Sequence, residues 1–387
     1  MRAAIARAAR AARFPAIAVV LAFVVGGLVV LLTGNNPFSV YKQLILGAGL
    51  DYPFHWLPGN PLGVDPDIAK FNLVATIVAT TPLILAGLCV AFAFRAGLFN
   101  IGGTGQFWVG GVTAFVIADR LSGLPGPLLI LLAIAGAALG GAVWGAIPGY
   151  FKAARGAHEV ISTIMLNWVA VYLGQYLFGL DGPLKGPTEN PISVDIPDRA
   201  KLPGIWGDVQ PVHAGIFVAL GAAVAFSLIF RRTAFGYDVR AVGFNPEAAR
   251  AGGVRVGRII VLAMAVSGLF AGLAGGGEVL GVNYHIASNE FAPLQIGFVG
   301  IAVALLGRNT AIGCVLAAFL FGALQSGSNQ LQGAFASDLA VPLSQTVQGV
   351  IVLLVSAELI GRKLTTRRVA RRPAERLPDE GQAPAAP

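Results

Sequence analysis

The chain has 387 residues, of which 56% are hydrophobic and 12% are charged, and its mean hydropathy is +0.73. The charged fraction is about half of that in soluble domains, which excludes an ordinary soluble fold. The formal net charge is +8, but the basic residues lie beside apolar segments and do not alternate with exposed aromatic residues, which argues against nucleic acid as a partner. Composition therefore indicates an all-α, polytopic membrane protein.

Ten apolar segments are candidates for crossing a hydrocarbon core about 30 Å thick. The first follows a basic N-terminus and is longer than the apolar part of a signal peptide, so we expect it to remain uncleaved. The ten segments cover residues 14–33, 71–94, 102–119, 128–150, 160–180, 213–230, 258–277, 292–307, 311–331 and 341–360. They define a transmembrane domain of residues 14–360, between a cytoplasmic basic segment of residues 1–13 and a basic, then disordered, tail of residues 361–387.

Lys and Arg predict the orientation of these segments. With the N-terminus in the cytoplasm, 21 of the 27 Lys and Arg fall on the cytoplasmic side, and a tenth segment returns the C-terminus to that side. The basic tail would then lie against anionic membrane lipid. Two long segments, 34–70 and 181–212, would face outside, and they are either connectors or a receiving surface for an external partner.

Residues 231–258, RRTAFGYDVRAVGFNPEAARAGGVRVGR, form the only long charged interruption in the second half of the chain. Asn245 can cap a short helix, Pro246 suits its first position, and Glu247 suits its positive end. Gly252 and Gly253 would stop this helix. A helix so short needs tertiary support, so it is either a capped surface turn or a docking element for a cytoplasmic partner.

Few polar residues fall at the depth of the membrane, where such groups either pair between helices or mark a pathway. They are Thr80, Thr81, Asn100, Thr104, Gln106, Ser162, Thr163, Asn167, Glu278, Asn283, His285, Glu290, Gln295, Gln325, Ser328, Asn329, Gln345 and Gln348. Because few are ionisable, a neutral polar solute suits the pathway better than an ion. The Gly-rich and Pro-containing stretches 99–106 and 278–298 predict broken helices that line the route. Within this set we predict five substrate-pathway residues, namely Asn100, Gln106, Asn167, Glu278 and His285.

Three motifs that would support an enzyme are missing from the sequence: GxxxxGK[ST], HExxH and GxSxG. We therefore predict no catalytic residue, no metal site and no cofactor in this chain. Residues 102–149 and 297–322 share a Gly-rich entrance before a small-residue span, which suggests an inverted repeat, although shared composition would give the same pattern.

Several stretches together resemble permease subunits of bacterial ABC importers, in the group that includes branched-chain amino acid and simple-sugar permeases. These stretches are GLFNIGGTGQFWVGG, GAHEVISTIMLNWVA, TAFGYDVRAVGFNPEAARAGGV and GFVGIAVALLGRN, and the second is most like the nucleoside and simple-sugar branch. The resemblance implies an inner-membrane permease with both termini cytoplasmic. It also implies a second, homologous permease subunit, an ATP-binding cassette ATPase that binds ATP and Mg, and an extracytoplasmic solute-binding lipoprotein.

In such permeases the cytoplasmic loop that matches 231–258 seats its short helix in a groove of the ATPase. The resemblance thus assigns ATPase coupling to Arg240, Asn245, Glu247 and Arg250. The prediction is an ATP-driven importer of a nucleoside or a sugar-like neutral solute. The alternative is a secondary transporter driven by an ion gradient, which would require paired buried carboxylates or a sodium site; an intramembrane enzyme has less support.

Overall fold

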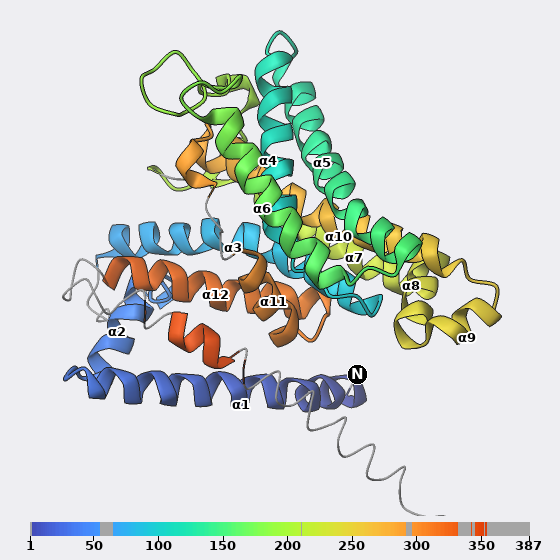
Figure 1. The fold of residues 1–387 in the computed structure, drawn as a ribbon. Coiled ribbons are helices and arrows are strands. Elements are labelled where there is room, and N and C mark those ends of the chain that lie inside the picture. Colours follow the sequence, from blue (N-terminus) through green and yellow to red (C-terminus); the bar gives the residue numbers. More distant parts are fainter. Residues whose placement is uncertain are drawn as a thin grey trace, which may run out of the picture.

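The computed structural model describes residues 2–54, 65–209, 211–291, 296–331, 342, 345–351 and 353 (Figure 1). These residues are mainly helical, as the composition predicts. The helices are α1 (Arg2–Leu32), α2 (Pro37–Gly47), α3 (Pro66–Arg95), α4 (Gly103–Arg120), α5 (Gly126–Arg155), α6 (Glu159–Phe178), α7 (Gly215–Arg232), α8 (Ala234–Phe244), α9 (Pro246–Ala251), α10 (Val256–Glu278), α11 (Ile296–Leu306) and α12 (Ala311–Leu331). A short antiparallel pair, β1 (Gly204–Trp206) and β2 (Val212–His213), precedes α7.

Seven helices in the described part of the chain are long and apolar enough to cross a membrane, which agrees with a multi-pass protein. They are α1, α3, α5, α6, α7, α10 and α12. Two further predicted segments, 102–119 and 292–307, coincide with α4 and α11. The first turn of α4 is Gly-Thr-Gly-Gln, which lowers its apolar character, and α11 has only 11 residues. Of the predicted segment 341–360, only 342, 345–351 and 353 are described, and they are helical.

Helix α10 packs against α3, α4 and α5, and its glycines allow the closest of these approaches. A Cβ on Gly272 would overlap the carbonyl oxygen of Ala137 and would lie 2.9 Å from the Cα of Gly141. Gly268 meets the backbone of Gly141 in the same way. Small residues bring helices together in lipid, where dispersion contacts replace water exclusion. The Gly and Ala richness of 133–149 and 268–277 is therefore a packing feature.

The connecting segments gather at two ends of the bundle. At one end, Lys70 near the start of α3 pairs with Asp208 at 2.9 Å, and the rings of Tyr52 and Trp206 lie 5.6 Å apart. The start of α3 and the chain before it thus meet the α6–α7 segment, residues 179–214. Figure 1 shows this segment far from α8 and α9. The orientation predicted from Lys and Arg likewise places these two segments on the same, outer side of the membrane.

Contacts at the other end join the last residue of α3 to the chain after α11. Arg95 donates two hydrogen bonds to the carbonyl oxygen of Asn309, at 2.8 and 3.1 Å. Its guanidinium also lies 5.1 Å from the ring centroid of Phe230, near the end of α7. The predicted orientation places Arg95, Arg308 and the loop 231–258 on one side, and the structure brings these regions together.

The contact between α5 and α10 gives a test of this packing. Gly272→Ala adds a methyl group where the backbone of α5 already lies, so we expect it to destabilise the folded protein by about 1–3 kcal/mol. Gly277→Ala is the matched control, because a Cβ at that position of α10 meets nothing within 4 Å. Thermal unfolding of the detergent-solubilised proteins measures the difference, and equal melting temperatures would contradict the close approach.

Candidate functional site

A cavity of about 650 Å³ lies among α3, α4, α11, α12 and the end of α10. Its volume is within the range of small-molecule sites, about 300–1,000 Å³. The lining residues are Ala75, Val78, Ala79, Pro82, Leu83, Phe107, Trp108, Glu278, Asn283, Glu290, Ile296, Val299, Gln325, Ser326, Ser328, Asn329, Gln345 and Gln348. One wall is thus apolar and aromatic, and the rest carries amides, hydroxyls and two carboxyl groups.

The aromatic wall belongs to a chain of rings that pack on one another. Trp108 lies 4.5 Å from Phe291 between ring centroids, and Phe291 stacks on Phe178 at 5.7 Å with an interplanar angle of 14°. Gly174 makes room for Phe291, because a Cβ there would overlap the ring, and Gln175 donates a hydrogen bond to the Phe291 carbonyl oxygen at 3.0 Å. These contacts fix the orientation of Trp108, a role that the sequence did not suggest.

The polar wall draws largely on the polar residues singled out from sequence. Eight of them line the cavity: Glu278, Asn283, Glu290, Gln325, Ser328, Asn329, Gln345 and Gln348. Three of the eight lie in the stretch 278–298, which was expected to line the route. The stretch 99–106 contributes no lining residue in the described part of the chain, although Phe107 and Trp108 follow it directly.

The helix break after α10 creates part of this wall. A π-helix, Val279–Asn283, follows Glu278, and Tyr284 ends it in the left-handed conformation at a φ of 62°. A π-helix pairs residues five apart, so it sets Glu278 and Asn283 on one face, whereas an α-helix aligns residues three and four apart. Both side chains consequently reach the cavity. Such turns are frequent at functional sites.

The α6–α7 segment holds the π-helical turn in place. Leu202 N–H donates to the Leu280 carbonyl oxygen at 2.8 Å, and Ile196 N–H donates to that of Tyr284 at 2.8 Å. The ring of His213 packs directly on Gly281, where a Cβ would overlap it. The turn therefore depends on residues that are about 70 to 90 positions earlier in the chain.

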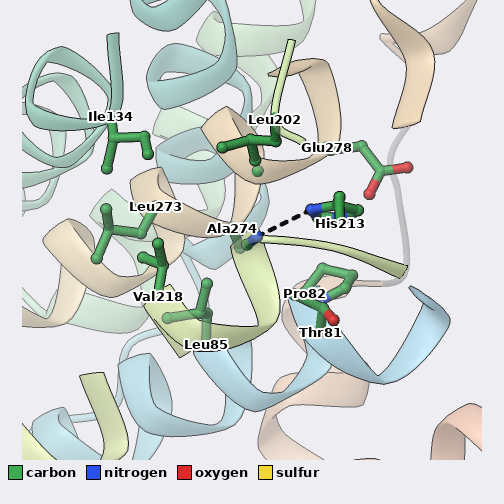
Figure 2. Close-up of a pocket in the computed structure, with 12 residues that line it drawn as sticks. Thr81, Pro82, Leu85, Ile134, Leu202, His213, Val218, Leu273, Ala274 and Glu278 are labelled. Atoms are coloured by element: carbon green, nitrogen blue, oxygen red, sulfur yellow. Dashed lines mark hydrogen bonds between the residues drawn. The ribbon is translucent and has the colours of Figure 1, made fainter. Parts of the chain in front are cut away.

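A second, narrow pocket of about 10 Å³, the size of one water molecule, adjoins the cavity. Figure 2 shows the Glu278 carboxyl group above the His213 ring, with Thr81 and Pro82 below. His213 Nδ1 accepts a hydrogen bond from the Gly215 N–H at 3.2 Å, whereas its buried Nε2 has no hydrogen-bond partner among the described residues. Glu278 lines both spaces, so it stands where they meet.

Asn100 and Gln106 lie in a hydrogen-bond network that closes the break between α3 and α4. Asn100 Nδ2 donates to Gln106 Oε1 at 2.9 Å and to Ser267 Oγ at 2.8 Å, while its Oδ1 accepts from the Gly102 N–H at 2.8 Å. Both side chains are 1% exposed. They hold the loop and do not line the described cavity.

Asn167 and His285 also lie outside the described cavity lining. Asn167 accepts from the Gly105 N–H at 2.8 Å and donates to the Ile101 carbonyl oxygen at 2.9 Å, so it supports the first turn of α4. His285 Nδ1 lies 3.3 Å from Asp195 in the α6–α7 segment. Among the five predicted pathway residues, Glu278 is therefore the one that lines the described cavity.

Glu290 is the second carboxyl group on the cavity and lies in the short 3₁₀ turn Ser288–Glu290. Its Oε2 accepts a hydrogen bond from the Ala287 N–H at 3.3 Å. The same turn positions Phe291, so one segment supplies a carboxyl group and the ring beneath Trp108.

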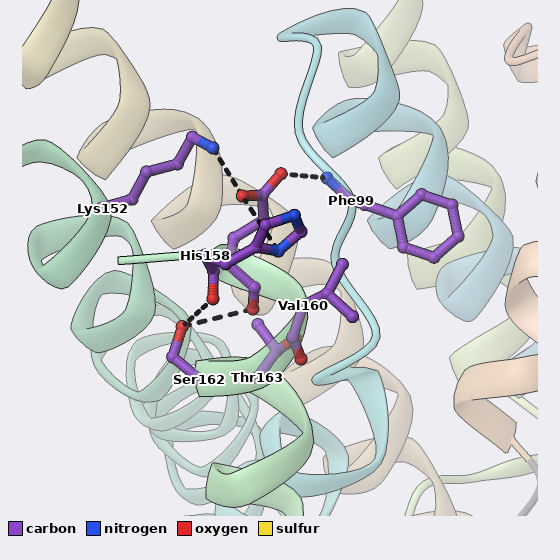
Figure 3. Close-up of polar contacts among 7 residues, drawn as sticks. Phe99, Lys152, His158, Val160, Ser162 and Thr163 are labelled. Atoms are coloured by element: carbon purple, nitrogen blue, oxygen red, sulfur yellow. Dashed lines mark hydrogen bonds and ion pairs between the residues drawn. The ribbon is translucent and has the colours of Figure 1, made fainter. Parts of the chain in front are cut away.

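Glu159, at the first position of α6, was missed by the sequence analysis. Its carboxylate pairs with Lys152 and accepts a weak hydrogen bond from the Phe99 N–H at 3.4 Å, and Figure 3 shows both contacts converging on one carboxyl group. Glu159 is buried, with 6% exposure. The GAHEV sequence offered a signal, because an acidic residue at a helix start beside an apolar span needs a partner. This pair ties α5 and α6 to the loop that precedes α4.

The charged loop forms two helices instead of the single short helix expected. Thr233 caps α8 by accepting from the Gly236 N–H at 3.0 Å, and buried Val239 and Val242 anchor it. The second helix, α9, has the predicted capping: Asn245 Oδ1 accepts from the N–H groups of Glu247 and Ala248 at 2.9 and 3.1 Å.

The exposed face of this loop includes three of the four predicted coupling residues. Asn245, Glu247 and Arg250 are exposed, while Arg240 lies partly buried and donates to the Gly236 carbonyl oxygen at 3.3 Å. Phe244, the last residue of α8, is 90% exposed, and the sequence analysis did not single it out. An exposed aromatic ring beside the predicted coupling residues gives this loop an apolar group that a partner could bury.

Comparison with known proteins identifies the class of this molecule. Residues 72–356 match the family described as "Branched-chain amino acid transport system / permease component". The chain belongs to this permease family. The match spans the cavity and the loop that carries α8 and α9, and the predicted ABC transporter permease is confirmed. The permease is a transport subunit and not an enzyme.

Individual relatives cover most of the permease. It is 38% identical to the guanosine ABC transporter permease protein NupP of Bacillus subtilis (strain 168), over 89% of this chain and 91% of the relative. It is 33% identical to a glucose ABC transporter permease protein of Haloferax volcanii, over 90% of this chain and 88% of the relative. A second guanosine permease protein of Bacillus subtilis, NupQ, is 30% identical over 67% of this chain and 82% of the relative.

Substitutions of two asparagines distinguish a side chain that supports a loop from one that contacts a solute. Asn100→Ala removes the acceptor for the Gly102 N–H and leaves buried partners unpaired, at a cost of about 1–3 kcal/mol each. We expect a lower melting temperature without a specific change in solute affinity. Asn329→Ala, on the cavity wall, should weaken solute binding with little change in stability. Thermal unfolding and equilibrium binding compare the two variants. If Asn100→Ala weakened binding without lowering the melting temperature, Asn100 would be a pathway residue after all.

Proposed function

We propose that the permease forms the translocation pathway for nucleosides or simple sugars in an ATP-driven importer. The observation that carries the proposal is the cavity of about 650 Å³, which combines an aromatic wall with amide, hydroxyl and carboxyl groups. A flat base or the apolar face of a sugar suits the rings of Phe107 and Trp108. The polar wall supplies hydrogen-bond partners for hydroxyl groups. The guanosine and glucose permeases among its relatives transport solutes of these two kinds, to judge from their names.

The proposed topology has ten spans in a bacterial inner membrane, with both termini in the cytoplasm. Lys and Arg support this orientation, since the positive-inside rule places most of them on the side of α8 and α9. Helix α4, the short helix α11 and the helical residues 345–351 supply three candidates for spans beyond the seven long helices. An inverted repeat, in which 102–149 and 297–322 are corresponding stretches, remains part of the proposal.

Three kinds of partner complete the proposed importer. An ATP-binding cassette ATPase would bind ATP and Mg and would receive α9 in a groove, with Phe244 as an additional anchor. A solute-binding lipoprotein would meet the outer end, formed by 34–70 and the α6–α7 segment. A second permease subunit is supported by the two guanosine permease proteins of one organism that both match this chain.

Uptake into proteoliposomes tests the function. The permease, reconstituted with the ATPase, second permease and lipoprotein from the same source, should accumulate labelled guanosine or glucose only when ATP is present. Trp108→Ala should reduce uptake about tenfold or more, because it removes a ring that would contact the solute. Uptake on an ion gradient without the ATPase would instead establish a secondary transporter.

The docking role of the charged loop has its own test. Glu247→Ala with Arg250→Ala, or Phe244→Ala alone, should lower ATP-driven uptake about tenfold while the variants insert normally, because these side chains are exposed and support little of the fold. Phe38→Ala is the matched control, since Phe38 is 86% exposed and lies in α2, away from α8 and α9 in Figure 1. Co-purification with the ATPase measures docking directly, and unchanged uptake and capture would refute this role.

A further inference from the structure

We infer that Glu278 and Glu290 make the cavity selective for uncharged polyhydroxyl solutes over the phosphate esters of the same solutes. The inference rests on the proposed function and specifies which nucleosides or sugars the pathway admits. It assigns a selectivity step to the permease itself, in addition to any choice that a binding protein makes.

The charges on the cavity wall are all of one kind in the part of the chain that the structure describes. Glu278 and Glu290 line it, and none of the described lining residues is Lys, Arg or His. Neither carboxyl group forms an ion pair with a described residue within 4.0 Å. Glu290 accepts the Ala287 N–H, and Glu278 has no hydrogen-bond partner among the described residues. Both groups therefore retain oxygens that can accept hydrogen bonds from a solute.

Hydroxyl groups and phosphate groups present opposite chemistry to such a wall. A sugar hydroxyl donates to a carboxylate, and charge-assisted bonds of this kind are roughly twice as strong as neutral ones. A phosphate dianion offers acceptors and needs cationic partners, usually Arg or Lys. Moving it into this cavity would remove its hydration without supplying a cation, and two carboxylates would repel it. Protonation of either carboxyl group would lessen the repulsion but would still leave the anion unpaired.

Contacts with the α6–α7 segment also hold in place the two turns that carry these carboxyl groups. Glu278 precedes the π-helical turn, which the bond from Leu202 and the packing of His213 on Gly281 hold in place. Glu290 ends a turn whose position is set by the Ser288 N–H bond to the Pro191 carbonyl oxygen at 2.9 Å. Both turns are thus braced by the α6–α7 segment. A braced position favours selectivity, because the carboxyl groups cannot easily withdraw from an unfavourable solute.

Equilibrium binding to the detergent-solubilised permease complex, without the lipoprotein, tests the inference. The probes are guanosine and guanosine 5′-monophosphate, or glucose and glucose 6-phosphate, at pH 8, which favours ionised carboxylates. Wild type should bind the uncharged probe about tenfold or more tightly than its phosphate ester. Glu278→Gln with Glu290→Gln should bring this ratio close to one, with weaker binding of the uncharged probe and tighter binding of the ester.

Two controls make the result specific. Glu189→Gln changes an exposed carboxylate of the α6–α7 segment and should leave the ratio unchanged. Glu290→Gln alone leaves helix α10 unchanged. It should lower the ratio of the two affinities, though by less than the double variant, and it keeps the test valid if the double variant fails to fold. If folded variants keep the wild-type ratio, the inference is wrong although the proposed function stands. If wild type binds neither guanosine nor glucose, the proposed solute class itself fails.

Discussion

The structure depends on one constraint: a lipid core offers no hydrogen-bond partner to a backbone that leaves the helix. Two such breaks concern the cavity, one after α3 and one after α10, and protein groups close both of them. Asn100, Gln106 and Asn167 satisfy the first, and the α6–α7 segment satisfies the second. The same breaks place Trp108 and Glu278 on the cavity. The cavity is thus a by-product of how the interrupted backbone is satisfied.

The features that could be predicted from the sequence are those that depend on residues close together in the chain. The capping of α9 by Asn245 needs only neighbours within three residues, so its residue types sufficed. Polar residues inside apolar segments likewise indicated the cavity wall, because few side chains of that kind occur there without a role. Sequence analysis treated α8 as part of a loop. This helix was missed because burial of Val239 and Val242 against other helices supports it.

The remaining features arise between positions far apart in the chain. Asn100 was expected in the pathway, but its partner Ser267 is 167 positions away, and no periodicity reveals such a pair. The π-helical turn is braced by Leu202 and His213, which lie in a segment that reads as a connector. The exposure of Phe244 also depends on the path of the surrounding helices. In each case tertiary contact, and not local propensity, decides the outcome.

The contact between the loop after α3 and the end of α8 has a mechanical consequence. Gly97, at a φ of +70°, lies against Gly243, so a Cβ on Gly97 would be 3.1 Å from the Gly243 carbonyl oxygen. Backbone meets backbone here, and there are no rotamers that could absorb a displacement. A shift of α8 would therefore press directly on the segment before α4 that Glu159 and Asn100 hold. The close approach at this joint comes from the absence of side chains.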